Sequence, residues 1–471
     1  MKRDLVPAAA LFAIACSAPS PVTHRDSPAR GLALRHVNVV DVEHGAVIPD
    51  QTIIISGSRI LSVQPASKAR VPSDARVIDA HGSYVMPGLW DMHAHVLANY
   101  ERFASVLIPN GVTGIRHPGN SRLDTLRAVR ARLGRATMPL PRLSAAGVLI
   151  DGNPPARPTG SVMLADAGNA SVLADSLLAS GVDFFKVYSR LKREPFIALA
   201  AEARRRGVPL TGHVPRALTP EELSDAGIRS IEHAFEFPLA CSNREADMRH
   251  LHARAEGAAD QRTVRMAIAD TLLRTYDRNK CIEIFKHLAR NGTFVTPTLY
   301  LYKRRGVTAA DSAVARYFAG GIPARGLVLP EFGDTDDRAR RWYEALAGLV
   351  GEMNRSGVML LAGTDTDAPL IWAGFSLHEE LQTLVDDAQL TAAEALRAAT
   401  VNPARYFAAT DSMGTIGPGK VADLVLLLGN PLSDIRHTRR ITAVVVNGRY
   451  VQRQELDQML ASAARAAGRS Q

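Results

Sequence analysis

The stretch PGLWDMHAH, residues 87–95, decides how the rest of the chain is interpreted. An apolar run ends here in two histidines that are separated by one residue. Because side chains alternate along an extended backbone, His93 and His95 point to the same side, which suits two ligands of one metal ion. A His-x-His pair also occurs by chance, so the pattern gains meaning only if other apolar runs end in similar residues.

Four further apolar runs carry or precede residues that bind metal ions or can be converted into ligands. They are Lys186, His213, His233 and Asp365. Each alone has an ordinary explanation, because a histidine can be a core residue, a lysine can extend its charge to solvent, and an aspartate can cap a helix. Their shared position at the ends of apolar runs favours one common site.

The chain from residue 86 to 411 alternates apolar runs with helical stretches, which is typical of parallel β/α units. Eight runs qualify as strands, and eight close a (β/α)8 TIM-like barrel whose active site lies at the carboxyl ends of the strands. The expected strands are Tyr84 to Leu89, Gly111 to Arg116, Arg142 to Gly147, Phe184 to Tyr188, Pro209 to His213, Ser230 to His233, Thr293 to Thr298 and Met359 to Gly363. The expected helices include Pro195 to Arg206, Asp337 to Arg355 and Thr391 to Phe407.

Short strand-like runs flank the barrel on both sides and are separated by turn residues. They are Leu34 to Val40, Thr52 to Ser56, Ile60 to Val63, Arg76 to Asp79, Ala422 to Leu428 and Ile441 to Val446. Asn447-Gly448 then gives a strong hairpin signal. Neither group alone could cover its apolar face, so residues 32–85 and 412–452 are predicted to form one small β-sandwich domain. Residues 453–471 are expected to form a helical tail, and the fold class is α/β.

The first residues predict export. Basic residues precede an apolar stretch that is too short to span a bilayer, so residues 1–15 are typical of a secretory signal peptide. The sequence AIAC at residues 13–16 is similar to a bacterial lipoprotein cleavage site, although Ala13 replaces a larger aliphatic residue. A lipid anchor at Cys16 and cleavage without lipidation are both open. Residues 16–31 would form a flexible tether, and the protein is expected in the periplasm or outside the cell.

Composition narrows the function classes. The net charge of +9 is spread along the chain, without basic runs interleaved with aromatic residues, so no nucleic-acid partner is expected. Cys241 and Cys281 are either two ordinary thiols or one bridge, because three cysteines make neither a disulfide framework nor a zinc box. The long connections at residues 237–290 and 307–336 are expected to hold lid or specificity insertions. The charge, the cysteines and the long connections are also compatible with an oligomer.

Together these features resemble the amidohydrolase superfamily, and in particular the branch related to imidazolonepropionases and to metal-dependent Xaa-Pro or Xaa-Arg dipeptidases. Besides residues 87–95, the matching motifs are Lys186, Gly212-His213, Glu232-His233, AGTD at 362–365, LHEEL at 377–381, AATVNPAR at 398–405, GTIGPGKVAD at 414–423 and VNGR at 446–449. They cover the chain from about residue 32 to 450. One position departs from the pattern: such proteins often carry Arg-Asp after the second strand, whereas Arg116 here precedes His117.

The resemblance implies a hydrolase with two divalent ions. It implies that carbon dioxide carbamylates Lys186, which turns a cation into an anionic carboxylate that bridges both ions. The other ligands would be His93, His95 and Asp365 for the more buried ion, and His213 and His233 for the more exposed one. Such ligands suit zinc foremost, with manganese or cobalt depending on availability.

The implied reaction is hydrolysis of an amide or peptide bond by a metal-bridging hydroxide, because two ions lower the pKa of a shared water and polarise the substrate carbonyl. Asp365 is the catalytic candidate, since it would move the proton from the water to the leaving amine. We expect a dipeptide-like substrate or an N-acyl amino acid.

Four residues just beyond strand ends are candidates for substrate binding, because they could face a carboxylate or an oxyanion. They are His117, Tyr188, Arg190 and Arg216. Exposed loop side chains fit these positions equally well. Asp367 and His378 are expected to orient ligands or to cap helices.

Two different functions also fit these residues. A mononuclear deaminase or a cyclic-imide hydrolase similar to imidazolonepropionase would use the histidines and the aspartate but would not need Lys186. A non-catalytic exported metal-binding protein would keep the ligands without needing Asp365 as a proton shuttle. Metal stoichiometry, measured together with release of amine or ammonia, distinguishes these functions.

Overall fold

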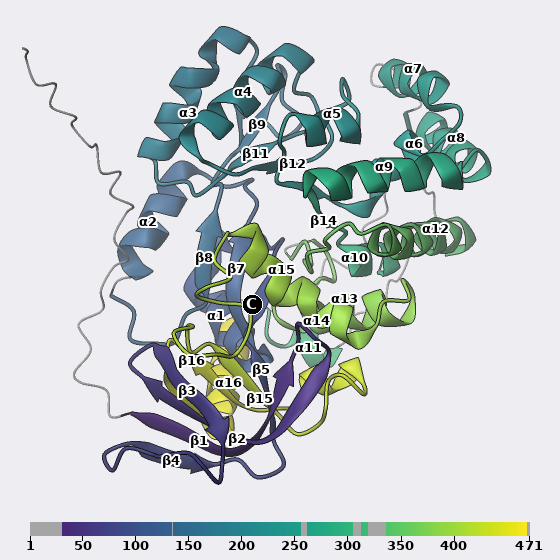
Figure 1. The fold of residues 1–471 in the computed structure, drawn as a ribbon. Helices are drawn as coiled ribbons and strands as arrows, with labels where there is room; N and C mark the ends of the chain where they lie inside the picture. Colours follow the sequence, from purple (N-terminus) through teal and green to yellow (C-terminus); the bar gives the residue numbers. More distant parts are fainter. Residues whose placement is uncertain are drawn as a thin grey trace, which may run out of the picture.

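The computed structural model describes residues 31–133, 135–255, 261–304, 312–318, 336–366 and 368–468. The expected signal peptide, the tether with Cys16 and most of the connection at residues 307–336 lie outside these ranges. The described chain contains parallel strands surrounded by helices, and a separate eight-stranded sheet at one end (Figure 1). The predicted fold class is confirmed: the chain is an α/β protein with a TIM-like barrel and a small domain built from both terminal segments.

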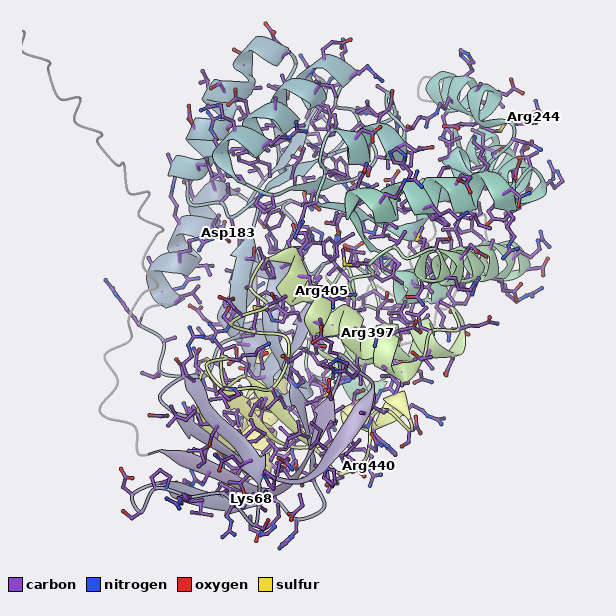
Figure 2. The ribbon with its side chains drawn as sticks, viewed as in Figure 1. Lys68, Asp183, Arg244, Arg397, Arg405 and Arg440 are labelled. Carbon is purple, nitrogen blue, oxygen red and sulfur yellow. A yellow bond between two sulfur atoms is a disulfide. The ribbon has the colours of Figure 1, made fainter. Side chains whose placement is uncertain are left out.

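The barrel strands form two parallel ladders, and isolated hydrogen bonds connect one ladder to the other. One ladder has the order β6-β7-β8 and the other the order β10-β9-β11-β12-β13-β14. The strands are β6 Leu89–Asp91, β7 Val112–His117, β8 Arg142–Ala145, β9 Leu149–Asp151, β10 Ser161–Met163, β11 Phe185–Val187, β12 Leu210–Gly212, β13 Ser230–Glu232 and β14 Phe294–Thr296. Asp183, labelled in Figure 2, donates its backbone N–H to Ala145 O at 2.9 Å where the two ladders meet.

The predicted eighth strand lies on the other side of this arrangement, although it forms no ladder of its own. Leu361 N donates to Val295 O in β14, and Met92 N, just after β6, donates to Ala362 O, both at 2.8 Å. Residues 359–363 therefore lie between the last strand and the first, as a barrel requires.

The predicted first strand is divided between the two domains. β5 (Tyr84–Pro87) pairs with β1 and β15 of the small sheet, whereas β6 pairs with β7 of the barrel. Pro87 has no N–H to continue the ladder. A Cβ on Gly88 would lie 2.1 Å from the Thr113 hydroxyl oxygen, so glycine is needed where the chain crosses.

Helices cover the outside of the barrel and bury apolar side chains against the strands in one continuous core. They are α1 Tyr100–Leu107, α2 Leu123–Leu133, α3 Ala170–Ala179, α4 Arg193–Arg206, α5 Pro220–Asp225, α9 Arg278–Asn291, α12 Asp336–Arg355, α13 Phe375–Asp386, α14 Ala392–Ala399 and α15 Val401–Tyr406. The single helix expected from Thr391 to Phe407 is broken at Thr400, which has φ −134° and ψ −74°. Pro403 explains the break, because it cannot donate to the carbonyl one turn earlier.

The connection before α9 contains helices α6 (Phe237–Ala240), α7 (Glu245–Ala255) and α8 (Gln261–Arg274), which lie beside the barrel in Figure 1. Two short helices, α10 (Leu299–Lys303) and α11 (Ser312–Ala315), follow β14. Cys241 and Cys281 form a disulfide that fastens the end of α6 to α9. Of the two possibilities left by the sequence, the bridge is the one formed.

The small domain is one eight-stranded sheet in the order β17-β16-β15-β5-β1-β2-β3, with β4 paired to β1. Its remaining strands are β1 Leu32–Asp41, β2 Ala46–Ser56, β3 Arg59–Pro65, β4 Arg76–Asp79, β15 Leu424–Leu427, β16 Ile441–Val446 and β17 Arg449–Gln452. Asn447 and Gly448 turn the predicted hairpin with φ of 50° and 79°. Strands from both terminal segments therefore share one apolar core.

Contacts with two helices join the small domain to the barrel. Arg405 forms an ion pair with Glu43 at 3.0 Å, and Arg397 donates to Glu43 O at 3.1 Å; Figure 2 labels both arginines. The last helix, α16 (Arg453–Gly468), packs against α1. None of the helices in the described ranges has the length and apolar character that crossing a bilayer requires.

Candidate metal centre

The strand ends place the predicted histidines and the aspartate together. The ligand atoms of His93, His95 and Asp365 all lie within 4.8 Å of one another. Asp365 Oδ1 lies 3.4 Å from His93 Nε2 and 3.2 Å from His95 Nε2. The His233 ring lies 4.6 Å from the His93 ring and 4.7 Å from the His213 ring. These five candidate ligands therefore form one cluster.

The turn after the eighth strand holds Asp365 against the first. Thr364 N and Asp365 N both donate to His93 O, at 3.2 Å and 2.7 Å. Asp365 has a φ of 60°, which is uncommon for a residue with a side chain. A Cβ on Gly363 would lie 2.7 Å from the His93 Cβ, so glycine allows the close approach.

Each of the four histidines is held through Nδ1, so that its Nε2 atom stays available. The partners of Nδ1 are Glu232 Oε2 for His93 (2.7 Å), Gly119 O for His95 (3.0 Å), Glu236 Oε1 for His213 (2.8 Å) and Thr298 Oγ1 for His233 (2.8 Å). Partners of this kind orient histidines that bind metal ions.

A buried ion pair supports His93. Arg116 Nη2 donates to both carboxylate oxygens of Glu232, at 2.8 Å and 2.7 Å, and neither side chain is exposed. Burial would raise the pKa of Glu232, but Arg116 and Lys186 hold it well below its usual range. Neither residue was predicted to have such a role. The available signal was an arginine and a glutamate inside two apolar strands.

Glu236 supports His213 from a different position, in the short helical turn Ala234–Glu236 that follows β13. Burial raises the pKa of Glu236 to about 8, and the nearby charges of Lys186 and Arg216 offset part of that rise. The sequence offered no signal for Glu236 beyond its position shortly after His233.

Lys186 lies in β11 and is 2% exposed. Its Nζ atom has no hydrogen-bond partner among the described residues. Burial lowers the pKa of this amine to about 8, against the attraction of Glu232. Leaving a buried polar group without a partner costs roughly 1–3 kcal/mol, so pairing this amine would stabilise the protein.

Two of the candidate substrate contacts, His117 and Tyr188, are close to the cluster. His117 is 1% exposed, and its Nδ1 lies 3.2 Å from Ala94 O. The Tyr188 ring meets the His213 ring edge-on at 4.4 Å. Burial raises the pKa of Tyr188, and a hydrogen bond with Arg157 opposes that rise. Arg157 was not predicted, because it belongs to a loop without a recognisable motif.

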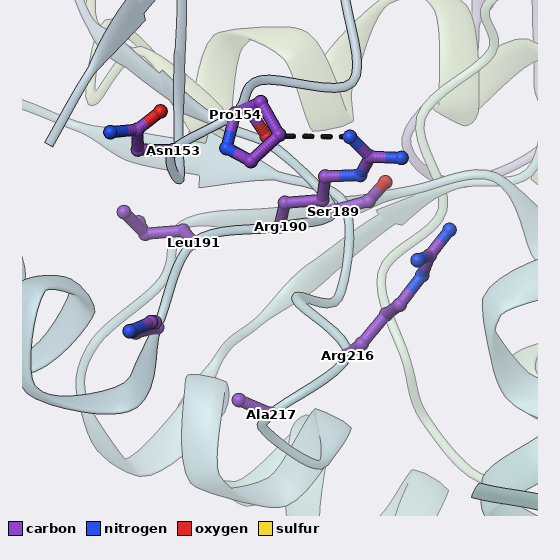
Figure 3. A pocket seen from close by; sticks show the side chains of 8 residues that line it. Asn153, Pro154, Ser189, Arg190, Leu191, Arg216 and Ala217 are labelled. Atoms are coloured by element: carbon purple, nitrogen blue, oxygen red, sulfur yellow. Dashed lines mark hydrogen bonds between the residues drawn. The ribbon is translucent and has the colours of Figure 1, made fainter. Parts of the chain in front are cut away.

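The other two candidates, Arg190 and Arg216, line a cavity of about 410 Å³ on the loops that follow β11 and β12 (Figure 3). Asn153 and Pro154 form another part of its wall. In Figure 3 the guanidinium groups of Arg190 and Arg216 point to the same side. Lys192 also lines the cavity, and no acidic residue among those that the structure describes does, so the cavity suits an anionic group.

His378 lies outside this cluster. Its Nδ1 and Nε2 atoms each lie 3.0 Å from an oxygen, that of the Thr438 hydroxyl and that of the Asn110 backbone. It therefore links α13 to two other segments and does not orient a candidate ligand. Asp367, the other residue expected in such a role, lies outside the described residues.

The donor set fits divalent cations. Burial, together with neighbouring charges, lowers the pKa of His213 and His233 well below the usual value, so both rings are in the neutral form that binds metal. Burial would raise the pKa of Asp365, but His93 and His95 hold it well below its usual range. Neutral imidazoles and an ionised carboxylate are ligands that zinc and similar ions accept. The Lys186 amine would need conversion to a carbamate before it could bind a metal ion beside these ligands.

A model of the amidohydrolase family matches residues 84–451 of the chain. The structure of a bottromycin amidohydrolase is similar over 95% of this chain and 93% of its own, with 26% identity and a TM-score of 0.73. A Xaa-Pro dipeptidase with methionine bound in its active site is similar over 90% of this chain and 100% of its own, with 18% identity and a TM-score of 0.63. Adenine deaminase from Rubrobacter xylanophilus is 36% identical over 92 residues, which cover 19% of this chain and only 15% of that enzyme.

Proposed function

This chain belongs to the amidohydrolase family, and from that membership we propose that it is a binuclear metal-dependent hydrolase of amide or peptide C–N bonds. The proposed substrates are dipeptides or N-acyl amino acids. The proposed ligands of two divalent ions, zinc foremost, are His93, His95, His213, His233, Asp365 and a carbamylated Lys186.

The observation that carries this proposal is the buried Lys186 Nζ, which has no hydrogen-bond partner among the described residues and is close enough to His213 and His233 to lower their pKa values. A neutral amine attacks carbon dioxide, forms a C–N bond and loses a proton, which leaves an anionic carbamate. The carbamate has two oxygens for two cations, whereas the ammonium form would repel them. The four histidines with occupied Nδ1 atoms support the same conclusion.

Two bound divalent ions would supply an acidified water and a polarised substrate carbonyl. Asp365 is ionised and is positioned by the turn at Gly363, so it can accept a proton and pass it to the leaving amine. Tyr188, hydrogen-bonded to Arg157 and in contact with His213, can donate a hydrogen bond to the oxygen on which negative charge develops.

The cavity formed by Arg190 and Arg216 supports a substrate with a free carboxylate. Its cationic lining would attract the acidic end of a dipeptide or an N-acyl amino acid. Arg216 is also near enough to Glu236 to affect its pKa, and Glu236 contacts His213. The proposed anionic subsite therefore adjoins the metal ligands.

A deaminase is the second candidate, and the partial match to adenine deaminases favours it over a cyclic-imide hydrolase or a metal-binding protein without activity. A deaminase or a cyclic-imide hydrolase would need the histidines and Asp365 but not a buried lysine. A metal-binding protein without activity would not need the proton shuttle. Lys186 therefore separates the leading proposal from the deaminase and the cyclic-imide hydrolase, and Asp365 separates it from the metal-binding protein.

We also propose that the protein is exported, anchored at Cys16 or free. The disulfide between Cys241 and Cys281 supports this, because structural disulfides persist mainly in oxidising compartments.

The function is tested with the zinc-loaded protein and a panel of Xaa-Pro dipeptides, Xaa-Arg dipeptides, N-acyl amino acids and adenine. We expect release of an amine or amino acid from at least one amide substrate, and loss of that activity in Lys186→Ala. Release of ammonia from adenine by both the wild type and Lys186→Ala would instead establish the deaminase. No turnover of any substrate, with metal bound, would support the binding protein.

A further inference from the structure

The small domain carries a second group of side chains of the metal-binding type. His36, Asp79 and His81 each offer a ligand atom, and these atoms all lie within 4.8 Å of one another. His36 belongs to β1, Asp79 ends β4, and His81 follows it. The two imidazole rings are stacked, with their centroids 4.5 Å apart. None of these residues takes part in the barrel cluster.

A fourth residue, Asp50 on β2, holds one of these histidines. Asp50 Oδ1 lies 2.8 Å from His36 Nδ1. Because an ionised carboxylate only accepts hydrogen bonds, Nδ1 carries a proton, and Nε2 is the atom left to bind a metal ion. A carboxylate behind a histidine is the arrangement that orients ligating histidines in metal sites. Asp50 therefore orients His36 for metal binding, and this contact does not involve Asp79 or His81.

The sheet brings the group together at an irregular place. The register between β1 and β2 shifts between Leu34 and Val37, on either side of His36, which has a φ of 55°. β4 pairs with β1, and Asp79 lies opposite Arg35 in that ladder. β4 has four residues, three of them exposed, and among the described strands it pairs with β1 alone.

From this arrangement we propose that His36, Asp79 and His81 form a structural metal site that fastens the edge strand β4 to β1. The ion would be zinc or another borderline divalent cation, because two imidazoles and a carboxylate suit such ions, whereas magnesium and calcium prefer oxygen ligands. The His81 side chain is 74% exposed and that of His36 28%, so an ion can enter from solvent without any change in the core. An ion that binds only the folded form stabilises it.

Equilibrium dialysis against zinc, followed by elemental analysis, counts the ions bound to each folded chain. We expect His36→Asn and His81→Gln each to bind one zinc fewer than the wild type. Asparagine tolerates the left-handed backbone at position 36, and circular dichroism verifies that the variant is folded. His44→Ala is the matched control, because His44 contacts Asp41 at 2.8 Å in the same domain but belongs to no group of three ligands among the described residues.

Hydrogen exchange provides a second readout. Zinc should slow exchange of the β4 amides in the wild type and leave it unchanged in His36→Asn. Equal zinc counts in the wild type and either ligand variant would overturn the site, and so would an equal loss in His44→Ala. The wild type and all the variants contain the same barrel. If the barrel bound no metal, the proposed function would fail, but the difference in zinc count between the wild type and the ligand variants would remain.

Discussion

The two halves of the barrel cluster are held in different ways. His93 contacts Glu232, which with Arg116 forms an ion pair of 0% exposure inside apolar strands. His213 contacts Glu236, which follows a strand and is near Arg216 at the cavity. The core half consists of His93 with Glu232 and Arg116, which lie inside the barrel. The mouth half consists of His213 with Glu236 and Arg216, which depend on the segments that shape the mouth of the site. We infer that the first half stabilises the fold and that the second adjusts metal and substrate binding.

The largest effect is expected at Lys186, which would connect the two halves. Lys186→Ala should lower kcat/KM by a factor on the order of 10³ or more, above the roughly 10- to 100-fold typical of residues that only orient ligands. Millimolar acetate or formate should restore part of the activity, because a small carboxylate can occupy the position of the carbamate. Lys286→Ala is the control and should keep its kcat/KM, because Lys286 forms an exposed pair with Glu283. Full activity in Lys186→Ala would contradict the proposal that Lys186 connects the two halves of the cluster.

The next effect concerns the core half. Arg116→Met leaves the Glu232 carboxylate buried without its cation, which should lower the free energy of unfolding by about 3–5 kcal/mol. Urea denaturation of the metal-free protein measures the change. Arg130→Met is the control, because Arg130 and Asp183 are 34% and 38% exposed and such pairs contribute no more than about 1 kcal/mol. Equal losses in the two variants would contradict the distinction between a buried and an exposed pair.

In the mouth half, a substitution should weaken metal binding more than it lowers the free energy of unfolding. Glu236→Gln should weaken zinc binding about 10- to 100-fold, because an amide is a weaker acceptor for His213 Nδ1 than the carboxylate that a bound cation would keep ionised. Its effect on unfolding of the metal-free protein should be small, since burial already opposes the charge of Glu236. Competition with a chelator in the His36→Asn background measures the affinity without the small-domain site. A strongly destabilised Glu236→Gln would make the two halves alike.

The smallest effect is expected at the cavity. Arg216→Ala and Arg190→Ala should each raise KM about 10-fold for substrates with a free carboxylate, the usual magnitude for one charge-assisted hydrogen bond. Amidated versions of the same substrates should show little change. Arg193→Ala, whose side chain pairs with Glu222 outside the cavity, is the control. A uniform increase in KM for both kinds of substrate would argue against an anionic subsite.

Local pattern in the sequence was enough to predict the fold class and the residues that now lie together. His93, His95 and the later strand-end residues could be found because each ends an apolar run, and parallel strands bring such ends to one side. The partners of these residues could not be found in the same manner. Glu232 and Arg116 contact each other across the barrel interior, and that pairing depends on strand register rather than on any local motif.

The division of the predicted first strand has a similar cause. Tyr84 to Leu89 is continuous in apolar character, so pattern alone cannot show where the chain passes from one sheet to the other. The crossing depends on the close approach of Gly88, which lies between β5 and β6, to Thr113 in β7. Likewise, only the fold shows that Arg190 and Arg216 share one cavity.

The most direct test is carbon-13 NMR of the zinc-loaded protein equilibrated with labelled bicarbonate. A carbamate at Lys186 should give one resonance in the wild type that is absent from Lys186→Arg. If the two spectra are the same, the lysine carries no carbon dioxide, and the proposed link between the two halves of the centre is wrong.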